Sequence, residues 1–103
     1  MTVVNVAEVY DVCCRRARVP IEKVDAVVLP LLDGPVRVLA AGIELARRAG
    51  EIRAARYDRR GRRLSLADCF LLAAPTTGEA IATADERILE VARELGLETI
   101  ALR

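Results

Sequence analysis

A length of 103 residues predicts one domain, and a hydrophobic content of 53% is enough to fill a single core. The formal net charge of +1 excludes strong steering of ligands by the charge of the whole molecule, and the absence of histidine excludes catalysis by imidazole. No apolar run is long enough to cross a membrane. Three cysteines without a C-x-x-C spacing, and an N-terminus without a basic leader segment, predict a reducing, cytoplasmic location.

The first half of the chain is predicted to be mostly helical, because its apolar residues repeat at helical spacing. Helices are expected over residues 3–14, 20–32 and 40–57, with a turn at 33–35 and a short strand at 36–38. Pro30 is expected to kink or end the second helix, and Gly50 to loosen the third.

The second half is predicted to alternate helix and strand. Helices are expected over residues 65–74 and 85–95, strands over 80–83 and 99–102, and an exposed basic loop over 59–63. This order favours an α/β layer with parallel strands.

Arginine is concentrated in the middle of the chain. Of the 16 basic residues only Lys23 is lysine, and eight arginines lie between Arg47 and Arg63 against two acids. The planar guanidinium suits two-point contact with phosphate, so the loop side chains are candidate contacts to a nucleic-acid backbone: Arg59, Arg60, Arg62 and Arg63. The alternative is a solvated, solubilising surface. The scarcity of aromatic residues argues against an RRM or OB-type single-strand binder.

Three acidic residues are candidates for chemistry, and each has a structural alternative. Glu8 interrupts an apolar helical row with no basic residue three or four positions away; it is otherwise a solvated rim glutamate. Asp68 stands in the first turn of an apolar helix, where a capping box with Ser65 is the structural alternative. Asp85 follows a strand, at the edge where open α/β sheets bind ligands, but it also suits a helix cap, as does Thr83 with Glu86.

The three carboxylates are expected to converge, because strand ends and helix starts of one parallel sheet share an edge. Hard carboxylate oxygens suit Mg²⁺ or Mn²⁺. Without histidine, the simplest nucleophile for a reaction on a phosphate backbone is metal-bound water.

The chain resembles PIN domains, specifically small VapC-like toxin ribonucleases, in three motifs taken in order: NVAEVY at 5–10, LSLAD at 64–68 and TAD at 83–85. The resemblance covers essentially the whole chain. It implies a Mg²⁺- or Mn²⁺-dependent endoribonuclease on a three-layer α/β/α sandwich, a homodimer, and inhibition by a VapB-like antitoxin. By position, Glu8, Asp68 and Asp85 would be the catalytic and metal-binding acids, and Thr83 a catalytic hydroxyl that orients the site. The loop arginines would hold the RNA.

The chain departs from this family at two places. The usual first strand, with its aspartate, would precede residue 5. Three explanations are open. The start site is misassigned or the chain was shortened, the missing strand is supplied by another chain, or the domain has decayed and no longer cleaves. A central gap in a parallel sheet would leave unpaired backbone groups, each costing on the order of 1–3 kcal/mol, so a rearranged sheet or association with a second copy by strand exchange is expected.

The second departure is Arg87, which takes the approximate place of a further acid. Loss of an acid lowers the expected metal affinity. The competing hypothesis is a non-catalytic PIN-like remnant that binds antitoxin or RNA without cleaving it.

Overall fold

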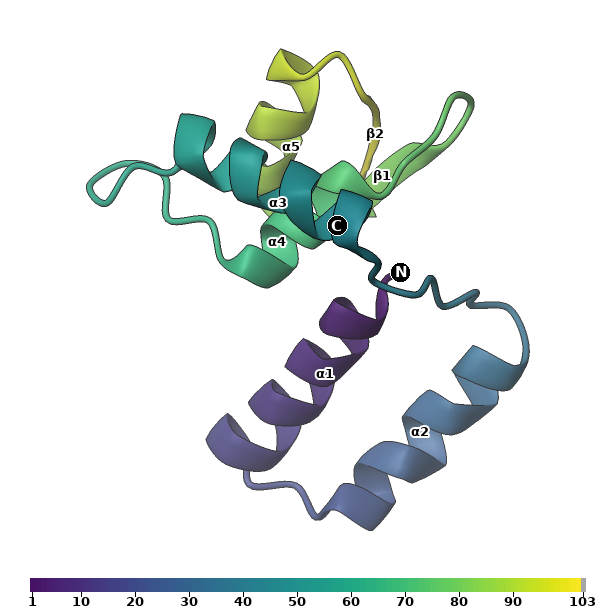
Figure 1. Ribbon diagram of the computed structural model, residues 1–103. Coiled ribbons are helices and arrows are strands. Elements are labelled where there is room, and N and C mark those ends of the chain that lie inside the picture. Colours follow the sequence, from purple (N-terminus) through teal and green to yellow (C-terminus); the bar gives the residue numbers. More distant parts are fainter. Residues whose placement is uncertain (103) are drawn as a thin grey trace. The chain divides into compact units, whose positions relative to one another are not determined.

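In the computed structural model, which describes residues 1–102, helices make up the first half of the chain and alternate with strands in the second (Figure 1). This mixture, with its parallel strand pair, agrees with the predicted α/β class. The chain divides into two compact units, Met1–Ala41 and Gly42–Arg103, and a single domain over residues 1–103 stays a prediction. Within residues 1–102, no helix is long and apolar enough to cross a bilayer.

The first unit is built from two helical segments. Helix α1 (Val3–Asp11) continues into the π-helical turn η1 (Val12–Arg16), and α2 (Ile21–Asp33) follows. Apolar side chains of α1 and α2 line a small pocket of about 110 Å³. The Tyr10 hydroxyl donates a hydrogen bond from α1 to Asp25 on α2, and this bond raises the pKa of Tyr10.

The start of α1 is set by a capping box. The Thr2 hydroxyl accepts a hydrogen bond from the Asn5 N–H at 3.3 Å, and Asn5 Oδ1 accepts one from the Thr2 N–H at 3.0 Å. Thr2 and Val24 are the fully buried residues of this unit, so most of its apolar side chains remain partly exposed.

One expectation for the first unit was wrong, and one alternative of another was not realised. Pro30 does not end α2, which continues to Asp33 although Pro30 has no N–H to donate, and a kink there stays a prediction. The predicted strand over 36–38 is absent; the nearest pairing is a single parallel bridge between Thr2 and Leu39. Valine favours extended backbone, but a strand also needs a partner over several residues, and here none is provided.

The second unit contains three helices and a pair of strands: α3 (Ile43–Arg56), α4 (Leu66–Ala73), β1 (Ala80–Thr83), α5 (Glu86–Glu94) and β2 (Glu98–Ala101) (Figure 1). Strands β1 and β2 pair in parallel, from Ala80 opposite Glu98 to Thr83 opposite Ala101. Since α5 connects them, they form a β–α–β unit. The expected strand over 80–83 is confirmed, and Gly50 lies inside an unbroken α3.

The core of the second unit is aliphatic. Helix α3 packs against α4, and α5 packs against both strands. The buried cluster consists of Ala49, Leu64, Cys69, Leu72, Ala73, Ile81, Ile88, Val91 and Ala92. Because this cluster anchors the first turn of α4 and the strand that precedes α5, it positions Asp68 and Asp85.

Candidate functional site

Asp68 is held in the first turn of α4 by a capping box with Ser65. The Ser65 hydroxyl accepts a hydrogen bond from the Asp68 N–H at 3.0 Å, and Asp68 Oδ2 accepts one from the Ser65 N–H at 2.9 Å. The capping role considered for Asp68 is therefore present, and it uses one oxygen of the carboxylate, Oδ2. Burial, and then the negative charge of Asp68, raise the pKa of the adjacent Cys69 thiol, which remains protonated in the core.

Asp85 lies just beyond the carboxyl end of β1 and caps α5. Its Oδ1 accepts a hydrogen bond from the Arg87 N–H at 2.8 Å, so this alternative is present as well. The Thr83 hydroxyl accepts a hydrogen bond from the Asp85 N–H at 3.1 Å. Thr83 therefore orients the backbone at Asp85, next to the position predicted for the site.

The Asp85 carboxylate is bound by the side chain of Arg87. Arg87 Nε lies 3.3 Å from Oδ1 and Nη2 lies 3.0 Å from Oδ2, while Nη1 donates to the Arg63 carbonyl at 3.1 Å. The hydrogen bond from Arg87 holds the pKa of Asp85 below its ordinary value of 3.8, against a smaller opposing effect of partial burial. Asp85 is therefore ionised at neutral pH.

Asp68 acts on the same guanidinium. The pKa of Arg87 is raised mainly by Asp85 and, to a smaller extent, by the negative charge of Asp68. The negative charge of Asp68 is therefore within electrostatic range of the guanidinium that pairs with Asp85. We call Asp68, Asp85 and Arg87 the acid–arginine cluster.

In this structure a guanidinium is paired with Asp85, so a divalent ion bound by both Asp85 oxygens would have to displace Arg87. Among residues 1–102, no group of three or more His, Cys, Asp or Glu side chains is placed to hold a metal. Both oxygens of Asp85 are bonded to Arg87, and the third predicted ligand, Glu8, belongs to the first unit, where it is half-buried on α1. The cluster fits a guanidinium, and Mg²⁺ or Mn²⁺ stays a prediction.

The four arginines proposed for RNA contact differ in their surroundings. Arg62 Nη2 lies 2.6 Å from Glu90 and 2.8 Å from Glu94, and only 19% of its side chain is exposed. It therefore joins the loop to α5. In contrast, Arg59, Arg60 and Arg63 are exposed.

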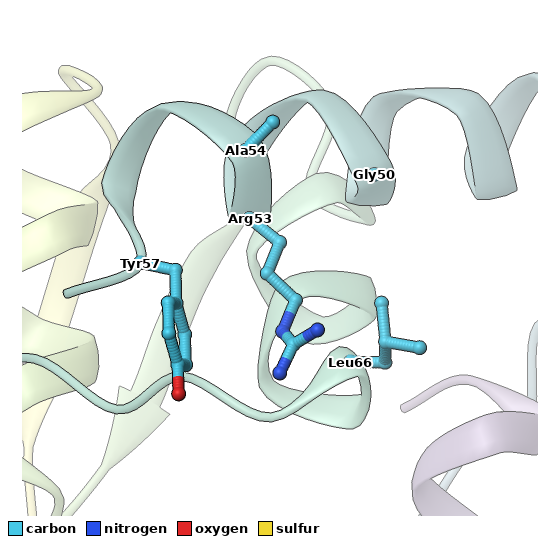
Figure 2. A pocket seen from close by; sticks show the side chains of 5 residues that line it. All are labelled: Gly50, Arg53, Ala54, Tyr57 and Leu66. Atoms are coloured by element: carbon cyan, nitrogen blue, oxygen red, sulfur yellow. The ribbon is translucent and has the colours of Figure 1, made fainter. Parts of the chain in front are cut away.

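An open pocket in the second unit was not foreseen from the sequence. It has a volume of about 400 Å³ and is lined by Gly50, Arg53, Ala54, Tyr57 and Leu66 (Figure 2). The guanidinium carbon of Arg53 lies 4.7 Å from the centre of the Tyr57 ring. We call this the Arg53–Tyr57 pocket. The i,i+4 spacing of an arginine and a tyrosine at the end of a predicted helix is a signal from which the pair could have been found.

Comparison with known proteins adds no relative: no protein-family model, curated protein or solved structure matches the chain. The chemistry of the side chains is therefore the basis for assigning a function. The second unit contains an Asp85–Arg87 ion pair near Asp68, exposed arginines and an arginine–tyrosine pocket.

Proposed function

We propose that this chain is a PIN-like domain of the VapC type, a divalent-metal-dependent endoribonuclease that serves as the toxin of a toxin–antitoxin pair. The observation that carries the proposal is the ion pair between Arg87 and Asp85, which lies within electrostatic range of Asp68. Two carboxylates from separate motifs, one at a helix start and one just after a strand, therefore influence one guanidinium. An acid pair beside exposed arginines suits a cation-assisted reaction on a polyanion.

In this proposal Asp68, Asp85 and Glu8 are the catalytic acids and ligands for Mg²⁺ or Mn²⁺, and Thr83 keeps Asp85 in place. Metal-dependent cleavage requires Arg87 to release Asp85, because its guanidinium occupies both carboxylate oxygens. The exposed side chains of Arg59, Arg60 and Arg63 contact the RNA backbone, and Arg62 supports the loop that carries them.

The proposed fold is the three-layer α/β/α sandwich of this family. The β1–α5–β2 unit supports it by supplying two parallel strands and the helix that connects them. A pair of strands leaves edges that further strands can extend, which favours a homo-oligomer formed by strand exchange.

The proposed protein partner is a VapB-like antitoxin, which would bind this chain in the cytoplasm. Large apolar side chains on α2 support an interaction surface, with Ile21, Val27 and Leu29 exposed by 54%, 65% and 48%. A unit with only two fully buried residues gains little stability from its own core, so a partner that covers α2 stabilises it.

A second candidate function is a PIN-like remnant that binds RNA or antitoxin without cleaving. The contact between Arg87 and Asp85 favours it, because an internal cation already neutralises the acid. Both candidates predict RNA binding, and they differ in turnover.

RNA cleavage in Mn²⁺ and in EDTA separates the two. The protein, an Asp68→Asn variant and a matched Asp33→Asn variant, which changes an exposed aspartate at the end of α2, are incubated with the same RNA. We expect Mn²⁺-dependent cleavage that is lost only in Asp68→Asn. Cleavage that survives Asp68→Asn rejects the acid assignment, whereas binding without cleavage in every sample supports the remnant.

A further inference from the structure

The side chain of Arg53 is anchored at one point and has free donors at the other. Its Nε donates a hydrogen bond to the Leu64 carbonyl at 3.0 Å, which fixes the guanidinium beside the first turn of α4. Neither of its Nη atoms has a hydrogen-bond or ion-pair partner within residues 1–102. Figure 2 shows the guanidinium between the Tyr57 ring and the Leu66 side chain. The pocket therefore presents rigid, unpaired donors suited to an oxyanion.

Tyr57 supplies a flat apolar surface at the same place. It is 41% exposed, and it also lines a second depression of about 430 Å³, together with Arg56, Asp58 and Arg62. Tyr57 thus lines two open pockets. An exposed ring next to an anchored arginine can stack on an unpaired base.

The space above this pair is open. A Cβ added at Gly50, which also lines the pocket, would meet nothing within 4 Å. Arg53 is the one charged side chain in the lining, so a phosphate meets no repulsion there. The volume of about 400 Å³ lies in the range of small-ligand sites.

We propose that the Arg53–Tyr57 pocket is a subsite for one nucleotide of single-stranded RNA. The base stacks on Tyr57, and the adjoining phosphate accepts hydrogen bonds from the Nη groups of Arg53. This inference rests on the proposed function and deepens it by naming the two side chains that bind one nucleotide of the substrate; the nucleotide must be unpaired, because a base inside a duplex cannot reach a side-chain ring.

The subsite and the cap of Asp68 share the start of α4. Leu66, the first residue of α4, lines the pocket. The Leu64 carbonyl that holds Arg53 directly precedes Ser65, the cap partner of Asp68.

The test is binding of a tetraribonucleotide that carries one 2-aminopurine, measured in EDTA so that no cleavage occurs. Stacking on Tyr57 quenches its fluorescence. We expect the wild type and Tyr57→Phe, which keeps the ring, to bind alike. Tyr57→Leu and Arg53→Gln should each bind about 5-fold more weakly or worse. Arg48→Gln, which removes an exposed charge from the same helix outside the pocket, should match the wild type.

Gly50→Leu provides a second test. The leucine side chain would fill the pocket without removing Arg53 or Tyr57, so we expect the same loss of RNA binding. Because leucine favours a helix more than glycine does, the melting temperature should be unchanged or higher. If Tyr57→Leu lowers the stability of the protein, Gly50→Leu still tests the pocket in a stable fold.

The inference is overturned by wild-type binding in Tyr57→Leu and Gly50→Leu, or by no quenching in the wild type. It is also overturned if a glutamate-rich peptide occupies the pocket in place of the RNA. None of these results bears on Mn²⁺-dependent cleavage, which is measured separately, so failure of the subsite is distinguishable from failure of the ribonuclease.

Discussion

The guanidinium of Arg87 forms two hydrogen bonds with the carboxylate of Asp85, from Nε to Oδ1 at 3.3 Å and from Nη2 to Oδ2 at 3.0 Å. The negative charge of Asp68 also raises the pKa of Arg87, to a smaller extent than Asp85 does. Arg87 therefore pairs directly with Asp85 and interacts at longer range with the charge of Asp68. It also competes with any other cation that would bind there.

Replacing Arg87 with Gln should increase the affinity for Mn²⁺ severalfold. The substitution removes the guanidinium from both Asp85 oxygens and a positive charge near Asp68, while the backbone N–H of residue 87 still donates to Oδ1 and completes the cap of α5. Calorimetric titration with Mn²⁺ measures the affinity, and carboxyl NMR should show the pKa of Asp85 rising toward 3.8. Equal Mn²⁺ affinity in the two proteins would show that Arg87 does not compete with the ion.

Substitutions of the two partners in the Ser65–Asp68 capping box should affect different properties, one the stability of the fold and the other RNA cleavage. Ser65→Ala removes the cap and should cost about 1 kcal/mol of unfolding free energy, but it keeps the acid and therefore cleavage below the melting temperature. Asp68→Asn keeps an oxygen for the Ser65 N–H and loses the charge, so it should fold well and fail to cleave. Urea unfolding and RNA cleavage test the pair, and equal loss of cleavage in both variants would mean that only the fold matters.

The loop arginines should divide into two classes. Arg62→Ala should lower the melting temperature, because it leaves Glu90 and Glu94 without their shared partner. Arg60→Ala should leave the melting temperature unchanged and weaken RNA binding with a shallower salt dependence, since its side chain is exposed. Thermal unfolding and salt titrations of RNA binding distinguish them, and the reverse pattern would refute the assignment.

Stability should fall on acidification through Glu94. Hydrogen bonds from Arg62 first, and from Arg56, hold the pKa of Glu94 below its ordinary value of 4.5, so the unfolded chain takes up this proton first. The stabilisation is fully present above 4.5 and is lost as pH falls through the lower folded-state pKa. The wild type should therefore be more stable than Glu94→Gln at pH 6 and equal to it at strongly acidic pH; a constant difference across this range would contradict the pairing.

The local features of this chain were predictable because short-range chemistry decides them. A short apolar run indicates β1. A capping aspartate before an amphipathic helix, with a glycine after it, indicates α5, and Ser65 with Asp68 indicates the start of α4. The strand expected at 36–38 failed because its outcome depends on a partner that the local pattern does not supply.

Long-range pairing was not predictable from the sequence. Arg62 lies 28 and 32 residues from Glu90 and Glu94, so its structural role appears only once α5 is in place. Asp85 suited an ion ligand and a helix cap equally by its position, and the side chain of Arg87 decides what it binds in this structure.

Paramagnetic broadening by Mn²⁺ is the most direct measure of whether the three acids meet at one ion. In the ¹⁵N-labelled protein, trace Mn²⁺ should broaden the amide signals of Glu8, Asp68 and Asp85 together, and Asp68→Asn should abolish this broadening. Broadening confined to other surface acids, or that of Asp68 and Asp85 without Glu8, would contradict a shared site for all three.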